Sequence, residues 1–302
     1  MERASAGSGM TETILTTADL QSGKDHTGEN FPVASFLVRP DARAPVMAYY
    51  RFARAADDIA DHPTASPAEK LRLLGLMRSG LEGEGAGLSD KGEGDPLAQA
   101  LGTVCRERGI SLAHAHDLLT AFERDCTVDR YQDWAGLIDY CRYSAMPVGR
   151  FVLDCHGEDR VLWPMNDSLC AALQIINHLQ DCAKDYRQID RVYIPMDSLN
   201  AAGIGVESLG EKRSSPALRE VITDLTLRTQ GLLRASAPFA DAIRDWRLAA
   251  EVAVIQRLAE DLCQVLLAHD PLSEKVHHTK ARALTLALRA AIRQAGRRIW
   301  PG

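Results

Sequence analysis

Apolar residues recur at intervals of three and four positions along most of the chain, which is the spacing of one face of an α-helix. A first helix is predicted over residues 41–61, and Pro63 ends it. Five apolar residues share one face of this helix: Val46, Tyr49, Ala53, Ala56 and Ala60. The next helix is predicted to begin at Ser66-Pro67-Ala68-Glu69, which supplies a cap serine, a proline at the first helical position and a capping-box glutamate.

The same pattern continues toward the end of the chain. Further helices are predicted over residues 96–108, 111–125, 134–155 and 167–186, with later helices beginning near Ser215, Phe239 and Ser273. Residues 80–96 are rich in glycine and acidic residues, so they are predicted to form a loop. Strand signals are confined to the short stretch 191–195, and the predicted fold class is therefore all-α.

The length of 302 residues suffices for one large domain, and no Pro/Ser-rich linker divides the middle of the chain. Residues 1–28 are small and polar and lack the apolar stretch of a signal peptide. We predict that they form a flexible N-terminal tail, and that residues 29–302 form a single domain.

Charge and cysteine content narrow the function and the location. A net charge of -6 provides no general basic face, so no nucleic-acid partner is expected. Seven cysteines without a C-x-x-C pair indicate reduced core thiols, and no apolar run is long enough to cross a bilayer, so we expect a cytoplasmic protein. The stretch Gly83-x-Gly85-x-Gly87 follows no predicted strand and lacks a final glycine, which argues against dinucleotide binding.

Two of the predicted helices carry acidic residues beside an apolar face. On the first, the polar row consists of Tyr50, Arg54, Asp57 and Asp61, with Asp58 next to it. On the second, the row consists of Gln174, Asn177, Asp181 and Asp185. This spacing places the carboxylates at the edge of the protein core rather than out in solvent.

Carboxylates one helical turn apart repel each other when ionised, so two such rows beside apolar faces indicate a bound cation. Oxygen ligands on rigid helices suit Mg²⁺, which is usually shared between carboxylates and phosphate oxygens. Arg54 and Arg191 lie close to the two rows in sequence, and arginine binds diphosphate oxygens in a bidentate manner. The alternative is that the rows are solvated acidic faces and the arginines form ordinary ion pairs.

Four stretches of the chain resemble the squalene/phytoene synthase family: residues 49–61, 140–149, 173–185 and 191–195. The resemblance extends from about residue 29 to the last helix. Within the family it favours the bacterial hydroxysqualene synthases of hopanoid pathways, on the basis of residues 29–35, residues 54–58, Pro147 and residues 179–181. Phytoene synthases usually have arginine where this chain has Gln180.

The resemblance implies a single-domain isoprenoid-synthase fold, in which a bundle of helices surrounds a central apolar channel with both acidic rows at its mouth. It also implies a carbon–oxygen lyase that ionises presqualene diphosphate with Mg²⁺ and captures the carbocation with water, giving hydroxysqualene and diphosphate. No NADPH is expected, and the number of magnesium ions is left open. The alternatives are a head-to-head prenyltransferase that makes presqualene diphosphate, squalene or phytoene, and a non-catalytic scaffold on the same fold.

The resemblance also assigns roles to individual residues. The metal ligands would be Asp57, Asp61, Asp181 and Asp185, with Asp58 in a lesser role. The diphosphate would be bound by Ser35, Arg54, Asn177 and Arg191, and the channel would be lined by Ala145, Val148, Gly149 and Gln174. Tyr50 and Tyr140 would lie near the reacting carbons and stabilise a cation, with packed core tyrosines as the alternative.

Two positions depart from the family pattern. Asp190 stands where relatives commonly have glycine, which puts the reach of Arg191 toward phosphate in question. Met146 replaces a smaller residue and would narrow the channel.

The last helix carries Leu284, Leu288, Ile292 and Ile299 on one face, and Arg282, Arg289, Arg293 and Arg297 on the opposite face. We expect the apolar face to pack on the bundle. The alternative is that this helix lies on an anionic membrane, as a peripheral contact at the inner face. The histidine pairs His114/His116 and His277/His278 lack metal-ligand spacing and are expected at the surface.

Overall fold

The structure is a computed structural model that describes residues 38–83 and 94–299. These residues form helices and no strand, apart from one isolated parallel bridge between Arg130 and Val192. In chain order the helices are α1 (Pro40–Ala60), α2 (Pro67–Glu82), α3 (Pro96–Arg108), α4 (Ala113–Asp125), α5 (Trp134–Ser144), α6 (Met146–His156), η3 (Arg160–Leu162), α7 (Trp163–Ile189), α8 (Met196–Ala201), η4 (Val206–Gly210), α9 (Pro216–Ser236), α10 (Phe239–Ala242), α11 (Trp246–Ala268) and α12 (Lys280–Ile299). The predicted all-α fold is confirmed.

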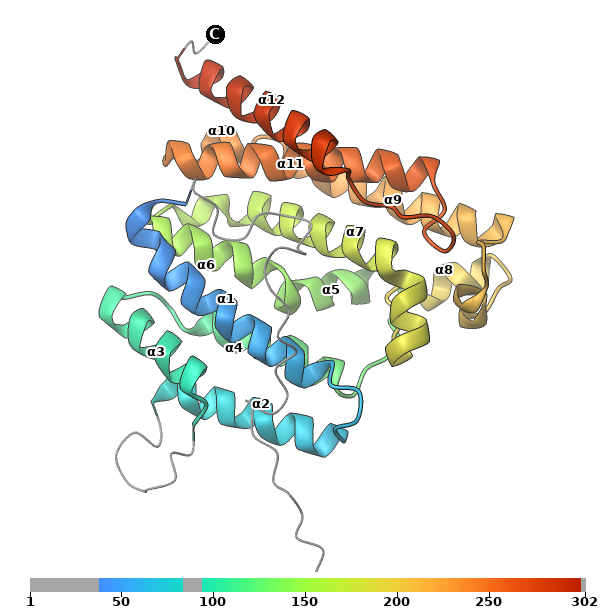
Figure 1. The fold of residues 1–302 in the computed structure, drawn as a ribbon, viewed down its shortest axis with the longest axis horizontal. Coiled ribbons are helices and arrows are strands. Elements are labelled where there is room, and N and C mark those ends of the chain that lie inside the picture. The colour runs from blue at the N-terminus through green and yellow to red at the C-terminus, as the bar shows by residue number, and fades with distance from the viewer. Residues whose placement is uncertain (1–37, 84–93, 300–302) are drawn as a thin grey trace, which may run out of the picture.

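The helices lie in successive layers, with α1–α4 at one end, α5–α7 in the middle and α9–α12 at the other end (Figure 1). The long helix α7 occupies the centre and packs against α6, α9 and α11. Within residues 38–83 and 94–299, no helix combines the length and the apolar character needed to cross a bilayer. The predicted tail of residues 1–28 lies outside the described residues.

Local sequence explains where several helices begin. The Ser66 hydroxyl accepts a hydrogen bond from the Glu69 N–H, with Pro67 at the start of α2, which confirms the predicted helix start. Asp95 caps α3 and Ser215 caps α9 in the same way, and each is followed by a proline. These caps satisfy backbone N–H groups that have no partner inside the helix.

The prediction of one continuous helix over residues 134–155 is wrong, because α5 ends at Ser144 and α6 begins at Met146. Between them Ala145 leaves the helical conformation, with φ -122° and ψ -46°. Pro147 in the first turn of α6 explains the break, since proline has no N–H to continue the hydrogen-bond ladder of a preceding helix.

The apolar core consists of two clusters of buried side chains. The first comes mainly from α1–α4 and includes Phe52 and Leu101. The second comes mainly from α5, α7, α9 and α11 and includes Ile176 and Leu262. Members of both clusters line one cavity, so the two halves of the core are separated by a hollow.

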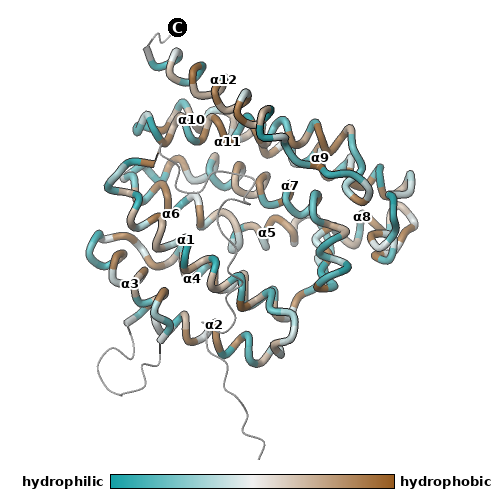
Figure 2. Tube along the Cα trace, viewed as in Figure 1, coloured by the Kyte–Doolittle hydropathy of each residue, from teal (hydrophilic) through white to brown (hydrophobic). Residues whose placement is uncertain are grey.

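Helix α12 packs on α11 with a side that lies between its apolar and basic faces and carries the half-buried Leu286 and Ala290 and the buried Gln294. Leu284, Leu288 and Ile292 are 71%, 59% and 63% exposed, and Figure 2 shows hydrophobic residues interspersed with hydrophilic ones along this helix. Two ion pairs join it to the bundle: Arg282 binds Asp261 at 2.8 Å and Arg297 binds Asp241 at 2.8 Å. The prediction that the apolar face packs on the bundle is therefore wrong.

The prediction that the paired histidines lie at the surface is wrong for two of them. His114 is 3% exposed, and its Nε2 lies 3.0 Å from Asp154 Oδ2. The His278 side chain is also buried, with Nε2 at 2.9 Å from Asp261 Oδ2. The carboxylates that hold the two rings come from α6 and α11, and burial lowers the pKa of His278.

Candidate active site

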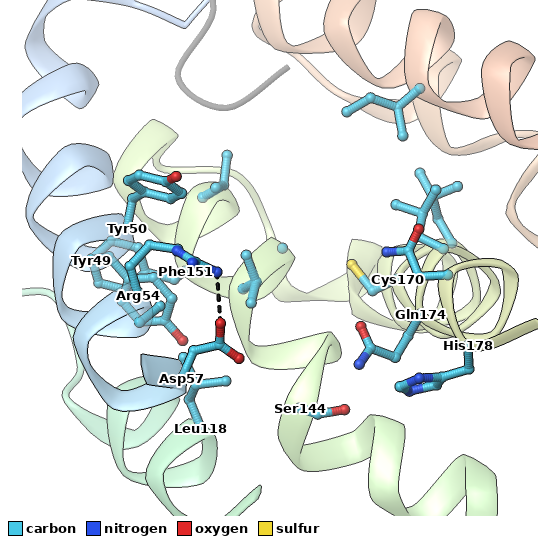
Figure 3. A pocket seen from close by; sticks show the side chains of 18 of the residues that line it. Tyr49, Tyr50, Arg54, Asp57, Leu118, Ser144, Phe151, Cys170, Gln174 and His178 are labelled. Carbon is cyan, nitrogen blue, oxygen red and sulfur yellow. Dashed lines mark hydrogen bonds and ion pairs between the residues drawn. The ribbon is translucent and has the colours of Figure 1, made fainter. Parts of the chain in front are cut away.

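A cavity of about 940 Å³ separates the two clusters of the core. Its walls come from α1, α4, α5, α6, α7, α10 and α11, and Figure 3 shows Tyr50, Arg54 and Asp57 of α1 across from Cys170, Gln174 and His178 of α7. Apolar side chains such as Leu169 and Val252 make up much of the surface. The volume lies in the range of small-molecule binding sites.

Both predicted acidic rows face this cavity. Asp57 of α1 and Asp61 at its C-cap reach it from one side, and Asp181 and Asp185 reach it from α7. Asp58 does not line the cavity, because its side chain turns toward Arg54 Nη2 at 3.5 Å. The rows therefore come from separate helices and share one hollow, as the sequence predicted; their role as metal ligands stays a prediction.

The basic residues next to the rows are bound to carboxylates. Arg54 Nη1 donates to Asp57 Oδ2 at 2.6 Å, an ion pair drawn in Figure 3. Arg191 is 6% exposed and donates to Asp61 Oδ1 at 3.0 Å and to the Asp125 carbonyl at 2.8 Å. Lys184, on the cavity wall between the two aspartates of its row, lies 3.5 Å from Asp181. Three cations therefore accompany the acids at the polar end of the cavity.

Asp190, the first departure from the family pattern, ends α7 with a φ of 51°. This is the left-handed conformation that glycine adopts freely, and aspartate is one of the few other residues that tolerate it. Its carboxylate pairs with Arg130 at 2.6 Å. The turn keeps a glycine-like geometry, and Arg191 reaches the cavity wall.

Two carboxyls at this end of the cavity have strongly raised pKa values. Burial, together with the nearby charge of Asp181, raises the pKa of Asp185 to about 7, although Lys184 opposes the shift. Burial also raises the pKa of Asp125 to about 7, against the effects of Arg191 and of a hydrogen bond from Tyr140. Titratable groups this far from their usual range, in one cavity, are typical of functional sites.

An aromatic cluster adjoins the acidic rows. Tyr140 donates to Asp125 Oδ2 at 2.9 Å, and its ring centroid lies 5.4 Å from that of Tyr193. The imidazole of His178 stacks on Tyr193 with centroids 3.4 Å apart. Tyr140 and Tyr50 both line the cavity, and their place near the reacting carbons stays a prediction.

The ligands available for a metal ion are carboxylate oxygens on facing walls. In the described part of the chain, no three His, Cys, Asp or Glu side chains come together closely enough to hold a metal ion. A closed protein cage is therefore absent from residues 38–83 and 94–299. The arrangement fits Mg²⁺, which keeps several waters and takes few protein carboxylates together with phosphate oxygens.

The predicted channel residues divide into two groups. Gln174, Asn177, Val148 and Gly149 line the cavity. Ala145 is buried at the break between α5 and α6 and does not line it, and the neighbouring Ser144 does. Met146 is also absent from the wall, so its side chain does not project into the cavity as expected. Ser35 lies outside the described residues.

Gly149 keeps α6 close to α7. A Cβ atom added there would lie 2.0 Å from Asn166 Oδ1 and 2.7 Å from Cys170 Sγ. We expect Gly149→Ala to lower the free energy of unfolding by about 1–3 kcal/mol, because the extra methyl group overpacks the interface. Gly75→Ala in α2 is the matched control, because nothing lies within 4 Å of its added Cβ.

Gly75→Ala should raise the free energy of unfolding by about 0.5–1 kcal/mol, since alanine is more stable in a helix than glycine is. Urea unfolding of both variants measures the difference. Equal stability of the two variants would show that α6 and α7 can separate without cost.

Several cavity residues were not singled out from the sequence: Asp125, Ser144, His178, Lys184, Tyr193 and Glu251. Most lie within predicted helices, where only the three-dimensional packing shows which side faces the hollow. For His178 and Lys184 a signal existed, because both lie within the second acidic segment.

Sequence comparisons agree with this geometry. The model of the family described as squalene/phytoene synthase matches residues 24–282. A hydroxysqualene synthase of Zymomonas mobilis is 53% identical over 93% of this chain and 93% of its own. Another, from Rhodopseudomonas palustris, is 50% identical over 87% of this chain and 88% of its own.

Solved structures with the same fold include a squalene synthase from Alicyclobacillus acidocaldarius, with a TM-score of 0.67 and 27% identity. The match covers 83% of this chain and 90% of that chain. A dehydrosqualene synthase solved with a ligand has a TM-score of 0.75 at 21% identity, covering 93% and 96% of the two chains, and supports the fold alone.

Proposed function

Because the chain belongs to the squalene/phytoene synthase family, we propose that it is a hydroxysqualene synthase acting on presqualene diphosphate. The observation that carries the proposal is one apolar cavity that receives acidic rows from two helices at one end. An apolar hollow suits a long isoprenoid chain, and the acids and cations beside it suit a diphosphate. The names of relatives that are 46–53% identical support the choice within the family.

In this proposal Asp57, Asp61, Asp181 and Asp185 hold Mg²⁺, which neutralises charge on the departing diphosphate when it is bound. Arg54, Arg191 and Lys184 add positive charge at the same end. These positive charges stabilise the diphosphate most strongly once it has left with its full negative charge. They therefore lower the barrier to ionisation, and no protein nucleophile is needed.

Aromatic side chains that could stabilise a carbocation line the cavity. Tyr140 is fully buried, and burial raises the pKa of its phenol well above the usual value, so the ring stays neutral. Its face, with that of Tyr50, can stabilise a cation formed in the cavity. The surrounding apolar walls keep bulk water away from that cation.

The reaction can be tested with purified protein, Mg²⁺ and three substrates supplied separately: presqualene, farnesyl and geranylgeranyl diphosphate. We expect only presqualene diphosphate to be consumed without NADPH, giving an alcohol and diphosphate in equal amounts. Condensation of either shorter diphosphate would favour a head-to-head prenyltransferase. Squalene that forms only with NADPH would also contradict the proposal, and no turnover of any of the three would favour a scaffold.

We also propose that α12 attaches the protein to an anionic membrane surface. Its exposed row of Leu284, Leu288 and Ile292 is accompanied by exposed Arg289 and Arg293. The helix contains six basic residues and no acidic one, whereas the whole chain has a net charge of -6. This local basic and apolar surface is complementary to anionic lipid. Membrane contact would suit an enzyme whose substrate carries a long hydrocarbon chain and whose product is apolar.

Co-sedimentation with lipid vesicles tests this surface. We expect binding to vesicles that contain anionic lipid, weak binding to neutral vesicles, and loss of binding in the variant L284Q/L288Q/I292Q. Leu227→Gln on α9 is the control, since it removes a leucine that is 49% exposed elsewhere. Unchanged binding of the triple variant would refute the proposal. A second refuting result would be that the unaltered protein is a dimer in solution and that the triple variant, but not the control, is a monomer.

A further inference from the structure

The capture of a carbocation by water requires a place that holds one water molecule next to the reacting carbon. Several buried polar atoms on the cavity wall lack a hydrogen-bond partner within the described residues, among them His178 Nε2 and Ser144 Oγ. Two others, Asp125 Oδ1 and Arg191 Nε, lie 4.0 Å apart as an ion pair. A buried polar atom without a partner costs free energy, which a bound water can recover. Figure 3 shows the Ser144 hydroxyl pointing toward the His178 ring.

The position of these atoms along the helices fits the reaction. His178 follows Asn177 on α7 and precedes Asp181 by about one helical turn. Ser144 lies one turn beyond Tyr140 on α5, and the Tyr140 ring centroid is 6.0 Å from that of His178. The two atoms therefore lie next to the acidic rows, near the place where a substrate bound by those rows would ionise.

The imidazole is also fixed and uncharged. It stacks on Tyr193 with an interplanar angle of 18°, which holds the plane of the ring. Burial and the nearby Arg191 lower the pKa of His178 to about 3, so the ring is neutral at neutral pH and can accept a hydrogen bond.

We propose that His178 Nε2 and Ser144 Oγ hold the water molecule that captures the carbocation, an inference that rests on the proposed function. The water donates hydrogen bonds to both atoms, which directs a lone pair on its oxygen toward the cation. Glu251, a buried carboxyl that lines the cavity from α11, is the competing site for this water.

The step balances in atoms and charge. The carbon–oxygen bond of the substrate breaks, and the diphosphate leaves with the electron pair. A new carbon–oxygen bond forms between the cation and the water oxygen. One water proton moves to His178 Nε2, from which it passes to the released diphosphate or to solvent. Without a held water, the cation instead loses a proton and forms an alkene.

The test measures the ratio of alcohol to diphosphate released from presqualene diphosphate, so that capture is separated from ionisation. We expect His178→Phe, which preserves a flat ring on Tyr193, to lower this ratio about tenfold or more, with hydrocarbon products in place of the alcohol. Ser144→Ala should lower the ratio less. His178→Gln keeps a hydrogen-bond acceptor, so its ratio should lie between those of His178→Phe and the unaltered protein.

His156→Phe is the matched control. His156 is also buried with an Nε2 that has no partner within the described residues, but it does not line the cavity. Its ratio should match that of the unaltered protein. An unchanged ratio in His178→Phe, Ser144→Ala and His178→Gln, or a loss found in Glu251→Gln instead, would overturn the inference. If the unaltered protein releases no diphosphate, it is the proposed function that fails.

Discussion

Replacing Asp181 with asparagine is expected to slow diphosphate release about a hundredfold or more, with little change in stability. Asp181 lines the cavity from α7 and faces Asp57 and Asp61 of α1 across it. Asparagine keeps the shape of the side chain but removes the negative charge that a magnesium ion needs. The substitution also removes repulsion with Asp185, so the free energy of unfolding should stay equal or rise.

This opposite behaviour of rate and stability distinguishes a metal ligand from a structural residue. Diphosphate release would be measured over a range of Mg²⁺ concentrations, and thermal unfolding would be followed in parallel. Asp224→Asn on α9 is the control, since it removes an aspartate that is paired with Arg228 away from the cavity. A variant at Asp181 with the full rate at low Mg²⁺ would refute the proposed metal site.

Replacing Arg191 with methionine is expected to lower the free energy of unfolding by about 3–5 kcal/mol. The guanidinium is buried and donates to Asp61 and to the Asp125 carbonyl, and its Nε lies 4.0 Å from Asp125 Oδ1. Its loss leaves the buried carboxyl of Asp125 without the nearby positive charge. The midpoint of thermal unfolding should fall by roughly 5–9 °C.

The loss should grow as the pH rises. The folded-state pKa of Asp125 is about 7, above its unfolded value, so this carboxyl opposes folding increasingly from about pH 4 to pH 7. Without Arg191 that pKa rises further, and the penalty continues to grow above pH 7. The double variant R191M/D125N should recover much of the stability, since it removes the uncompensated charge.

Arg130→Met provides the comparison for an exposed ion pair. Arg130 binds Asp190, whose side chain is 75% exposed, so the loss should stay below about 1 kcal/mol. An effect of Arg191→Met as small as that of Arg130→Met would show that Arg191 does not stabilise this end of the cavity.

The sequence predicted the features that depend on local spacing. The start of α2 at Ser66 follows from a capping pattern of four residues. The acidic rows of α1 and α7 follow from helical periodicity, and both were expected beside apolar faces. That the two rows share one cavity was an inference from chemistry, because repelling carboxylates on each helix needed the same cation.

The features that the sequence missed depend on contacts between distant residues. A helical wheel shows that α12 has an apolar and a basic face, but not which face meets the bundle. Asp261 and Asp241 contribute to this orientation by pairing with Arg282 and Arg297, while Arg289 and Arg293 stay exposed. His114 was expected at the surface for the same reason, since Asp154, its partner, lies forty positions later in the chain.

The hollow between the two halves of the core has a consequence for turnover. An isoprenoid tail that fills it gains about 25 cal/mol for each Å² of apolar surface removed from water, as side chains do when a protein folds. Under the proposed reaction, ionisation removes the diphosphate and every attachment it made, yet the hydrocarbon remains. The alcohol then stays in the cavity, where its hydrocarbon chain is buried against the apolar side chains of the core. Release of the alcohol into water would cost all of the free energy gained by burying this chain, whereas its transfer into a lipid phase would not.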